Sequence, residues 1–321
     1  MAIRIRAYKV EIMHLDTFFE TAKADIERRL KSTVEKYEEK AKLEYFLKSG
    51  KRLRPLLSLL VFRACGGNEG SYQSALDLAV AIELQHSASL VHDDIIDGDS
   101  KRRNNLSYYR MFGIEDAILT GHRAIVLGFK NILTCEPRIL ETFFDVWDKS
   151  LEGEVKDIES RKNFLELLTS GEELYFDIIV NKTASLFAGA AKIGSQQARV
   201  SKDLETLFWE YGKHIGIGYQ LADDSRDFNN GNLEVLPIPW IIRKLDNRTM
   251  KSFTSGLKDG LPPSKVLSKL SIDTQSLFNE EIMKMQRVAE NLARSMMIPE
   301  NEFKPLLLDA PRFIISRCFE D

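Results

Sequence analysis

Apolar residues along most of the chain recur at intervals of three and four, the spacing that places them on one face of an α-helix. The clearest example is residues 76–97, where Leu76, Val80 and Leu84 share one broad face. Gly98 follows directly, and glycine is favoured just past a helix end. The pattern therefore predicts a long helix that ends just before this glycine.

The nine prolines also favour helices, because they leave long tracts uninterrupted. None lies between Pro55 and Pro137 or between Pro137 and Pro237, and a proline inside a helix costs about 3 kcal/mol. The same spacing of apolar residues predicts helices over residues 15–46, 121–133, 139–151, 163–172, 176–193 and 201–227. Sustained alternation of apolar and polar residues, which marks strands, is missing, so we predict an all-α fold.

The sequence gives no sign of a division into domains. It contains no linker rich in glycine, serine or proline and no repeat of fixed period. The pair Pro262-Pro263 is typical of a corner between two helices. We therefore expect one domain over residues 1–321, with residues 1–14 as a candidate N-terminal extension.

The composition is that of an ordinary globular protein, and it narrows the function classes. The chain has 321 residues, 44% hydrophobic and 29% charged, with a formal net charge of −3. Domains that bind nucleic acid usually carry a strong positive charge, so no nucleic-acid partner is expected. Cys65, Cys135 and Cys318 are odd in number, far apart and without a CxxC pair, which indicates neither disulfides nor a zinc site and favours a reducing compartment.

No targeting or membrane-spanning segment is evident in the sequence. The N-terminus carries Arg4, Arg6, Lys9 and Glu11 where a signal peptide needs an unbroken apolar stretch. The longest apolar runs, such as residues 56–62, are much shorter than the roughly 20 residues that span a bilayer. We expect a cytoplasmic protein with no stable membrane insertion.

The first feature that indicates chemistry is DDIID at residues 93–97, followed by a pair of arginines at 102–103. Helical spacing places Asp93 and Asp97 one above the other, with Asp94 beside them. Carboxylates at a helix C-terminus repel one another and oppose the helix dipole, at a cost of up to about 1 kcal/mol each. A hard cation such as Mg2+, which binds carboxylates, waters and phosphates, would compensate for this cost.

A second motif, DDSRD at residues 223–227, repeats the spacing near the end of another predicted helix. Two such edges facing each other across a cavity could hold magnesium ions with a diphosphate between them. A solvated acidic face would be the better interpretation of one motif alone, but the recurrence argues against it.

An EF-hand does not fit, because placing Gly98 at loop position six puts Ile95 and Asn104 at ligand positions. The stretch 216–221, GIGYQL, lacks the third glycine of a dinucleotide-binding fingerprint and follows helical sequence.

The third feature is basic. GKRLRP at residues 50–55 brings Lys51, Arg52 and Arg54 to the start of an apolar helix, where free backbone N–H groups and the helix dipole also favour anions. This arrangement is a candidate diphosphate receptor, although a solvated turn explains these residues equally well when they are taken alone. KT at residues 182–183 lies in a small, apolar helical stretch, where a lysine with a buried stem is the alternative.

In this order, the motifs GKRLRP, HDDIIDGDSKRR, KT and YQLADDSRD resemble those of the trans-isoprenyl diphosphate synthases, also called polyprenyl synthetases. The resemblance covers nearly the whole chain from about Leu15 and includes the geranylgeranyl diphosphate synthases. It implies an all-α, isoprenoid synthase-type helical bundle around a deep central cavity, usually a homodimer. It also implies a prenyltransferase that needs Mg2+, or Mn2+ in its place, and condenses isopentenyl diphosphate head-to-tail with an allylic diphosphate by ionisation, condensation and elimination.

The resemblance further implies roles for individual residues. Mg2+ and the allylic diphosphate would be bound by the aspartates of both motifs, Asp93, Asp94, Asp97, Asp223, Asp224 and Asp227. Isopentenyl diphosphate would be held by Lys51, Arg54, His86 and Arg103, and the allylic diphosphate would also contact Arg102 and Lys182. Thr183 and Gln220 would line the reaction centre, which makes Asp93, Lys182, Thr183, Gln220 and Asp223 the implied catalytic set. Without the motif order, His86 would be interpreted as a hydrogen-bonded core histidine.

Two small residues bear on the length of the product. Ala88 and Ser89 lie five and four residues before Asp93, about one helical turn below the acidic edge. Short-chain members of the family often carry an aromatic residue here as a floor, so the resemblance implies geranylgeranyl diphosphate or a longer product. Small residues at this spacing also permit close helix packing, and that interpretation carries equal weight.

The chain departs from the family pattern after the second motif. Residues 228–237, FNNGNLEVLP, contain no lysine where the family has one that contacts the allylic diphosphate. Arg226, inside the motif, is either a substitute cation or a surface ion-pair partner. Asn104 and the pair Gly121-His122 also differ from the residues usual at those places. These departures bear on efficiency and substrate preference more than on the class of reaction.

Two other functions on this fold are alternatives to a prenyltransferase. A class I terpene cyclase or diphosphate lyase on the same fold needs only one diphosphate site, and Lys51, Arg54 and Arg103 argue for a second one. A non-catalytic partner subunit of a prenyl synthase need not keep paired acidic edges that cost stability. We therefore expect a prenyltransferase.

Overall fold

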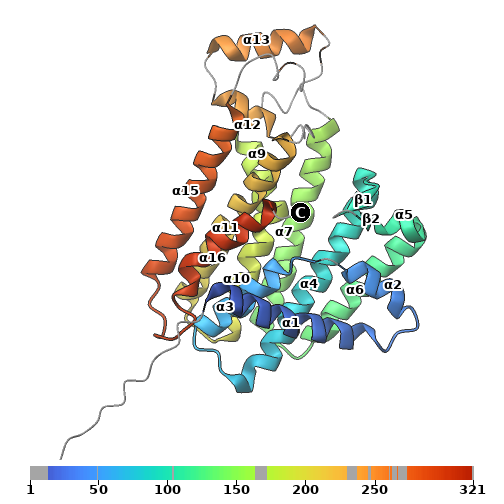
Figure 1. Cartoon of the computed structure of the whole chain (residues 1–321), viewed down its shortest axis with the longest axis vertical. Helices are drawn as coiled ribbons and strands as arrows, with labels where there is room; N and C mark the ends of the chain where they lie inside the picture. The colour runs from blue at the N-terminus through green and yellow to red at the C-terminus, as the bar shows by residue number, and fades with distance from the viewer. Residues whose placement is uncertain are drawn as a thin grey trace, which may run out of the picture.

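The computed structural model describes residues 14–48, 50–102, 105–162, 172–229, 237–244, 247–259, 261, 266 and 273–319. This part of the chain is almost entirely helical, which confirms the expected all-α fold (Figure 1). Within it, extended pairing is limited to β1 (Lys101–Arg102) and β2 (Asn105–Leu106), two-residue antiparallel strands in which Lys101 pairs with Leu106.

The α-helices are α1 (Leu15–Val34), α2 (Lys40–Leu47), α3 (Leu53–Ala64), α4 (Glu69–Asp97), α5 (Tyr108–Phe112), α6 (Ile114–Ile132), α7 (Pro137–Lys162), α9 (Glu172–Ile179), α10 (Ser185–Gln197), α11 (Lys202–Asn229), α12 (Ile238–Arg243), α13 (Asn247–Lys258), α15 (Thr274–Ser295) and α16 (Leu306–Ser316). A π-helical turn, η1 (Val180–Ala184), joins α9 to α10, and a 3₁₀ turn, η2 (Arg317–Phe319), follows α16.

The helix predicted over residues 76–97 is confirmed, together with its end signal. The helix expected over 76–97 is the C-terminal part of α4, and Gly98 caps it in the left-handed conformation with φ of 72°. At the other end, the side chain of Asn68 accepts a hydrogen bond from the backbone N–H of Ser71, which satisfies one of the free donors of the first turn.

Other predicted boundaries differ. The single helix expected over 15–46 is two helices, because turns at 35–39 redirect the chain between α1, which packs on α3 and α4, and α2, which packs on α4 and α6. The helix expected over 176–193 is interrupted by η1. Most of the helix predicted over 163–172 and the pair Pro262-Pro263 lie outside the described residues.

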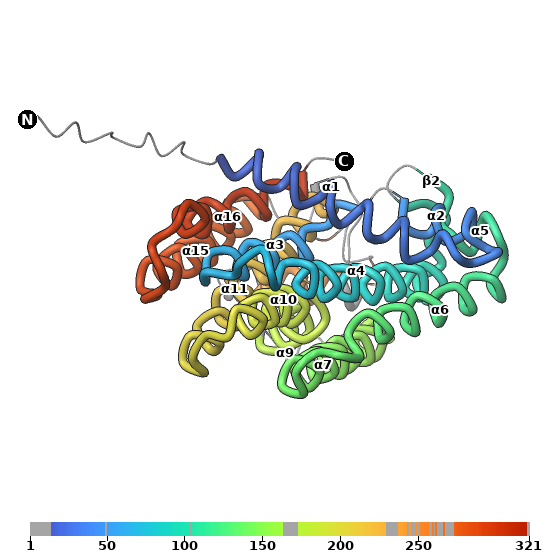
Figure 2. The backbone as a smooth tube through the Cα atoms, turned by 90° about the horizontal axis from the view of Figure 1, so that it is seen from below, coloured from blue at the N-terminus to red at the C-terminus, as the bar shows by residue number. Residues whose placement is uncertain are grey.

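The helices form a bundle with α4 and α10 near its centre. Helix α4 packs against α3 and α6, and α10 packs against α3, α7 and α11. Seen from below, α1 lies along one side of the bundle and α7 along the opposite side (Figure 2). Ala79, Val80, Ala81 and Leu84 of α4 are fully buried, as expected for a helix surrounded by others. No helix among the described ranges has both the length and the apolar character needed to cross a membrane.

Candidate active site

The central cavity, of about 1190 Å³, brings together residues from distant parts of the chain. Its walls come mainly from α3, α4, α6, α7, η1 and α11, with further residues from β1, α9 and α10. Most of the site residues expected from the sequence line it: Lys51, Arg54, His86, Ala88, Ser89, Asp93, Asp97, Arg102, Lys182, Thr183, Gln220, Asp223 and Asp227. Asp94 and Asp224 are not among the lining residues, and Arg103 lies outside the described residues.

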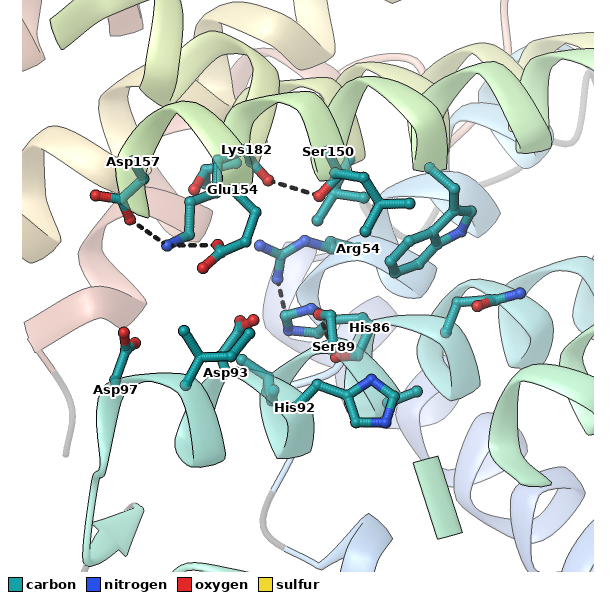
Figure 3. A pocket seen from close by; sticks show the side chains of 18 of the residues that line it. Arg54, His86, Ser89, His92, Asp93, Asp97, Ser150, Glu154, Asp157 and Lys182 are labelled. Carbon is teal, nitrogen blue, oxygen red and sulfur yellow. Dashed lines mark hydrogen bonds and ion pairs between the residues drawn. The ribbon is translucent and has the colours of Figure 1, made fainter. Parts of the chain in front are cut away.

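The first acidic motif is divided between the cavity and the protein interior. Asp93 and Asp97 rise from α4 toward α7 on the far side of the cavity (Figure 3). Asp94 is 1% exposed and accepts a hydrogen bond of 2.6 Å from Nε of Arg102. The division follows from helix geometry, since residues four apart share a face whereas the next residue along is turned by about 100°.

Two arginines neutralise this motif from outside the helix. Arg102, which pairs with Asp94, belongs to β1. Arg161, on α7, donates a hydrogen bond of 2.6 Å from Nη1 to the Asp97 carboxylate. Asp93 has a different environment: burial, reinforced by the negative charge of Glu154, raises the pKa of its carboxyl group to about 7.

Sequence reasoning missed a second acidic wall on α7. Lys182 Nζ forms ion pairs with Glu154 Oε2 at 2.7 Å and with Asp157 Oδ2 at 2.6 Å (Figure 3). Burial alone would lower the pKa of Lys182, but the two carboxylates outweigh it and the pKa is raised. The available signal was the i, i+3 spacing of Glu154 and Asp157, which on its own is also typical of a solvated helix face.

A π-helical turn presents Lys182 and Thr183 to the cavity. Such turns are rare and occur frequently at functional sites. Helix α7 approaches this turn closely at Gly153, where an added Cβ would lie 2.3 Å from the backbone nitrogen of Lys182. Ser150, one turn earlier, donates a hydrogen bond of 3.1 Å to the Lys182 carbonyl. The close packing fixes the backbone from which both side chains project.

The second motif has the same division but different partners. Asp224 is 5% exposed and accepts hydrogen bonds from the Tyr175 hydroxyl at 2.5 Å and from Gln220 Nε2 at 2.8 Å. Gln220 Oε1 in turn accepts a bond of 2.7 Å from the hydroxyl of Thr183. The buried aspartate thus orients the Gln220 amide, and through it Thr183, at the cavity wall.

The cavity-facing aspartates of this motif pair with an arginine from the same helix. Arg226 contacts Asp223 at 2.5 Å through Nη2 and Asp227 at 3.2 Å through Nε. Its Nη1 donates to the carbonyl of Cys318 at 2.7 Å, and the Cys318 thiol donates to Asp223 at 3.3 Å. The turn η2 is therefore tied to the second motif, a contact between residues 92 positions apart that the sequence did not indicate.

The basic segment expected to bind diphosphate is only partly directed to the cavity. Lys51 Nζ donates to the Arg317 carbonyl at 2.7 Å, and Arg54 Nη1 lies 2.9 Å from His86 Nε2. Arg52, whose backbone is left-handed (φ of 59°), also lines the cavity, but its side chain is held by carboxylates. It is 3% exposed and is paired with Glu83 at 2.5 Å and Glu27 at 2.7 Å.

The donor set is suited to magnesium shared with a substrate. Among the described residues, no three His, Cys, Asp or Glu side chains are grouped closely enough to hold a metal ion by themselves. Mg2+ usually takes only one or two carboxylates and completes its shell with waters and substrate phosphates. Asp93 with Asp97, and Asp223 with Asp227, supply such pairs of hard oxygen donors on the cavity wall.

Below the acidic edge, the cavity wall becomes mainly apolar. Ala88 and Ser89 line it from α4, as expected from their positions. The opposite walls carry Ile118, Ile125 and Phe129 from α6, and Phe144, Trp147 and Leu151 from α7. A charged mouth that leads to an apolar chamber suits a ligand with an anionic head and a hydrocarbon tail.

The sequence model of the polyprenyl synthetase family matches residues 37–235. The geranylfarnesyl diphosphate synthase of Methanosarcina mazei is 38% identical over 179 residues, which cover 56% of this chain and 58% of that protein. The match therefore spans less than two thirds of this curated relative.

Solved structures resemble the chain over nearly its whole length. The geranylgeranyl pyrophosphate synthetase of Pyrococcus horikoshii is 25% identical with a TM-score of 0.76, covering 94% of this chain and 98% of that one. A decaprenyl diphosphate synthase from Rhodobacter capsulatus gives a TM-score of 0.79 over the same shares at 21% identity, a likeness of fold alone.

Proposed function

Since this chain belongs to the polyprenyl synthetase family, we propose that it condenses isopentenyl diphosphate with an allylic diphosphate, head to tail, with release of diphosphate. Membership confirms the resemblance expected from the motifs. One observation carries the proposal: two pairs of cavity-facing carboxylates and several cations surround the mouth of a chamber with a mainly apolar inner wall. The relatives named as geranylgeranyl and geranylfarnesyl diphosphate synthases support a product of 20 carbons or more.

In the proposed reaction, the C1–O bond of the allylic diphosphate breaks and its electron pair leaves with the diphosphate. The double bond of isopentenyl diphosphate then attacks C1, and a proton is lost from the carbon beside the new cation to form the new double bond. Mg2+ held by Asp93, Asp97, Asp223 and Asp227 would supply positive charge that stabilises the leaving diphosphate. The apolar wall keeps water from the carbocation.

We assign the remaining roles to the chain's own side chains. Lys182 and Arg102 would bind the allylic diphosphate, because both line the cavity and can exchange carboxylate partners for phosphate oxygens. Lys51 and Arg54, with His86, would bind isopentenyl diphosphate. The hydroxyl group of Thr183, which donates a hydrogen bond to Gln220, would direct its oxygen toward the reacting carbons. The released diphosphate would accept the final proton.

We also propose a homodimer built from a single domain over residues 1–321. The support for the dimer is a set of exposed apolar side chains on α6 and α7 that do not line the cavity, which includes Ile114, Leu119, Val126 and Val155. Exposed apolar patches of this kind commonly mark interfaces. Light scattering coupled to size-exclusion chromatography tests the proposal: a mass near twice 36.7 kDa is expected, and a monomer would contradict it.

A direct assay tests the reaction. Isopentenyl diphosphate is supplied with Mg2+ and with dimethylallyl, geranyl or farnesyl diphosphate in turn, and the products are resolved by chain length. Linear all-trans products and release of one diphosphate per condensation are expected. Cyclic hydrocarbons would indicate a terpene cyclase instead, and no consumption of isopentenyl diphosphate by the purified chain would refute the proposal.

A further inference from the structure

The apolar chamber ends against a closely packed part of the core. Beneath it lies a cluster of buried residues from α4, α6, α7 and α10: Leu78, Ala81, Ile82, Ile132, Ile139, Phe143, Ala190 and Ile193. Phe129 and Trp147 pack against this cluster and also line the cavity. Phe129 meets Phe143 edge to face, with ring centroids 6.5 Å apart. Phe144, whose ring centroid lies 5.5 Å from that of Phe129, also lines the cavity. Phe129, Phe144 and Trp147 therefore cover the core where the chamber stops, and Trp147 is the largest of them.

Trp147 occupies the boundary between the chamber and a small void. A void of about 10 Å³ lies on the inner side, lined by Ile82, Phe143, Val146, Gly189, Ala190 and Ile193. Four residues line both spaces, Arg54, His86, Trp147 and Leu186. Arg54 and His86 contact each other at 2.9 Å, which leaves the indole as the largest apolar group in the partition.

The position of Trp147 on α7 gives the depth of the chamber. Trp147 precedes Glu154 by seven residues and Asp157 by ten, so it lies about 10–15 Å along the helix from the carboxylates at the mouth. An extended isoprene unit, four skeletal carbons joined by bonds of about 1.5 Å, spans about 5 Å. Two to three units therefore fit between the reacting carbon and the indole. Ala88 and Ser89, one turn below Asp93, are too small to stop the chain earlier.

We propose that Trp147 is the floor that sets the product length, and that the chamber accepts a farnesyl tail as its longest primer. One further condensation gives geranylgeranyl diphosphate, whose four-unit tail no longer fits above the indole for another round. This inference rests on the proposed function and makes it more specific, because it assigns the primer class and one residue that limits it.

The first test compares products. Wild type supplied with farnesyl and isopentenyl diphosphates and Mg2+ should form mainly the 20-carbon product. Trp147→Ala joins the chamber to the void beneath, and the fraction of products with 25 or more carbons should rise at least tenfold. Trp209→Ala is the matched control, because Trp209 lies on α11 beside Lys192 and does not line the cavity. An unchanged distribution in Trp147→Ala would overturn the inference.

The second test does not depend on turnover. Farnesyl diphosphate is titrated with Mg2+, without isopentenyl diphosphate, while tryptophan emission is recorded for the otherwise wild-type chain, Trp147→Phe and Trp209→Phe. All three proteins also carry Trp240→Phe, because Trp240 stacks on Tyr175, a partner of Asp224, and would add its own signal. The emission change should be present in the otherwise wild-type chain and Trp209→Phe and lost in Trp147→Phe; its survival in Trp147→Phe would refute the contact with the floor. If no protein consumes isopentenyl diphosphate, the proposed reaction fails, and this titration still decides on the floor. Trp147→Phe also covers the case in which the alanine variant does not fold.

Discussion

The two acidic motifs have the same spacing and the same arrangement of cavity-facing and buried aspartates, but their charges are neutralised in different ways. In each, the first and fifth aspartates line the cavity and the second is buried. Around the first motif, the positive charges come from other elements, Arg102 on β1 and Arg161 on α7. In the second, Arg226 of the same helix pairs with the cavity-facing aspartates, and the buried aspartate accepts hydrogen bonds from Tyr175 and Gln220.

The comparison shows that the spacing of a motif fixes which aspartates face the cavity, whereas the surrounding elements fix which groups pair with them. Spacing on a helix fixes which carboxylates share a face, so the cavity-facing pairs are alike. The partners of Asp94 and Asp224 depend on which elements pack nearby, and these are an arginine in one case and a tyrosine with a glutamine in the other. The motifs should therefore respond alike when a cavity-facing residue is changed and differently when a buried one is.

The largest expected effect is on turnover, and it should be the same in both motifs. Asp93→Asn and Asp223→Asn each remove a charged oxygen donor from the cavity wall, and each should lower product formation about 10²–10³-fold, the range for removing one electrostatic contact to a developing charge. Steady-state assays with Mg2+ and binding of Mn2+ by electron paramagnetic resonance measure the effect. Asp203→Asn, an exposed position on α11, is the control. Near-normal turnover in one of the two variants would mean that the motifs are not equivalent.

The buried aspartates should differ in their contribution to the free energy of unfolding. Asp94→Asn removes the carboxylate 2.6 Å from Arg102 Nε and leaves this guanidinium with the more distant Asp99, at 4.0 Å, at an expected cost of about 2 kcal/mol. Asp224→Asn replaces the carboxylate that accepts hydrogen bonds from Tyr175 and Gln220 by a neutral amide. Both donors are neutral and can rotate, so the expected cost is about 1 kcal/mol. Urea unfolding of each variant measures these values.

Double-mutant cycles identify the source of that difference. Asp94→Asn combined with Arg102→Gln should show a coupling above about 1 kcal/mol, and Asp224→Asn combined with Tyr175→Phe a smaller one. Equal couplings in the two cycles would mean that the charge of the partner does not matter at these sites.

The sequence was sufficient to predict which aspartates of each motif share a helix face, but not which residues of other elements lie beside them. Helical periodicity and Gly98 located α4 and its end, and the spacing of Asp93 and Asp97 placed both on the cavity side. Arg52 was grouped with the cavity cations and does line the cavity, but its side chain is buried and paired with two carboxylates. Its burial beside Glu83 is a tertiary contact that no local pattern encodes.

The missed residues share one physical reason. Glu154 and Asp157 have the charge pattern of an exposed helix, and only the packing of α7 on η1 makes them the partners of Lys182. Cys318 reaches the second motif from the far end of the chain. Contacts between helices distant in sequence depend on how the helices pack, which spacing within each helix does not determine.

A smaller effect, on the reactivity of a buried thiol, should distinguish Arg226, which belongs to the helix of its own motif, from Arg161, which reaches the first motif from another helix. Arg226→Gln removes the donor to the Cys318 carbonyl and should loosen η2. The buried Cys318 thiol should then react with a disulfide reagent about tenfold faster, because local opening becomes easier by about 1.4 kcal/mol. Arg161→Gln, which removes the cation beside the first motif, is the matched control and should leave this rate unchanged. Peptide mapping distinguishes Cys318 from Cys65 and Cys135. Equal rates in the two variants would show that Arg226 does not hold the turn.

The smallest expected effect is a gain of stability in the metal-free protein, and it should be confined to the first motif. The pKa of Asp93 is raised from 3.8 to about 7, so between pH 4 and 7 the folded state holds a proton that the unfolded state has lost, and stability falls as the pH rises through this window. Asp93→Asn removes that loss. Its melting temperature should match that of wild type near pH 4 and exceed it by about 2 °C or more above pH 7, for a gain of about 1 kcal/mol. Asp223→Asn, which loses an ion pair with Arg226 at 2.5 Å, should show no gain. A difference between Asp93→Asn and wild type that stays constant from pH 4 to 8 would mean that burial of the Asp93 charge does not limit the stability of this edge.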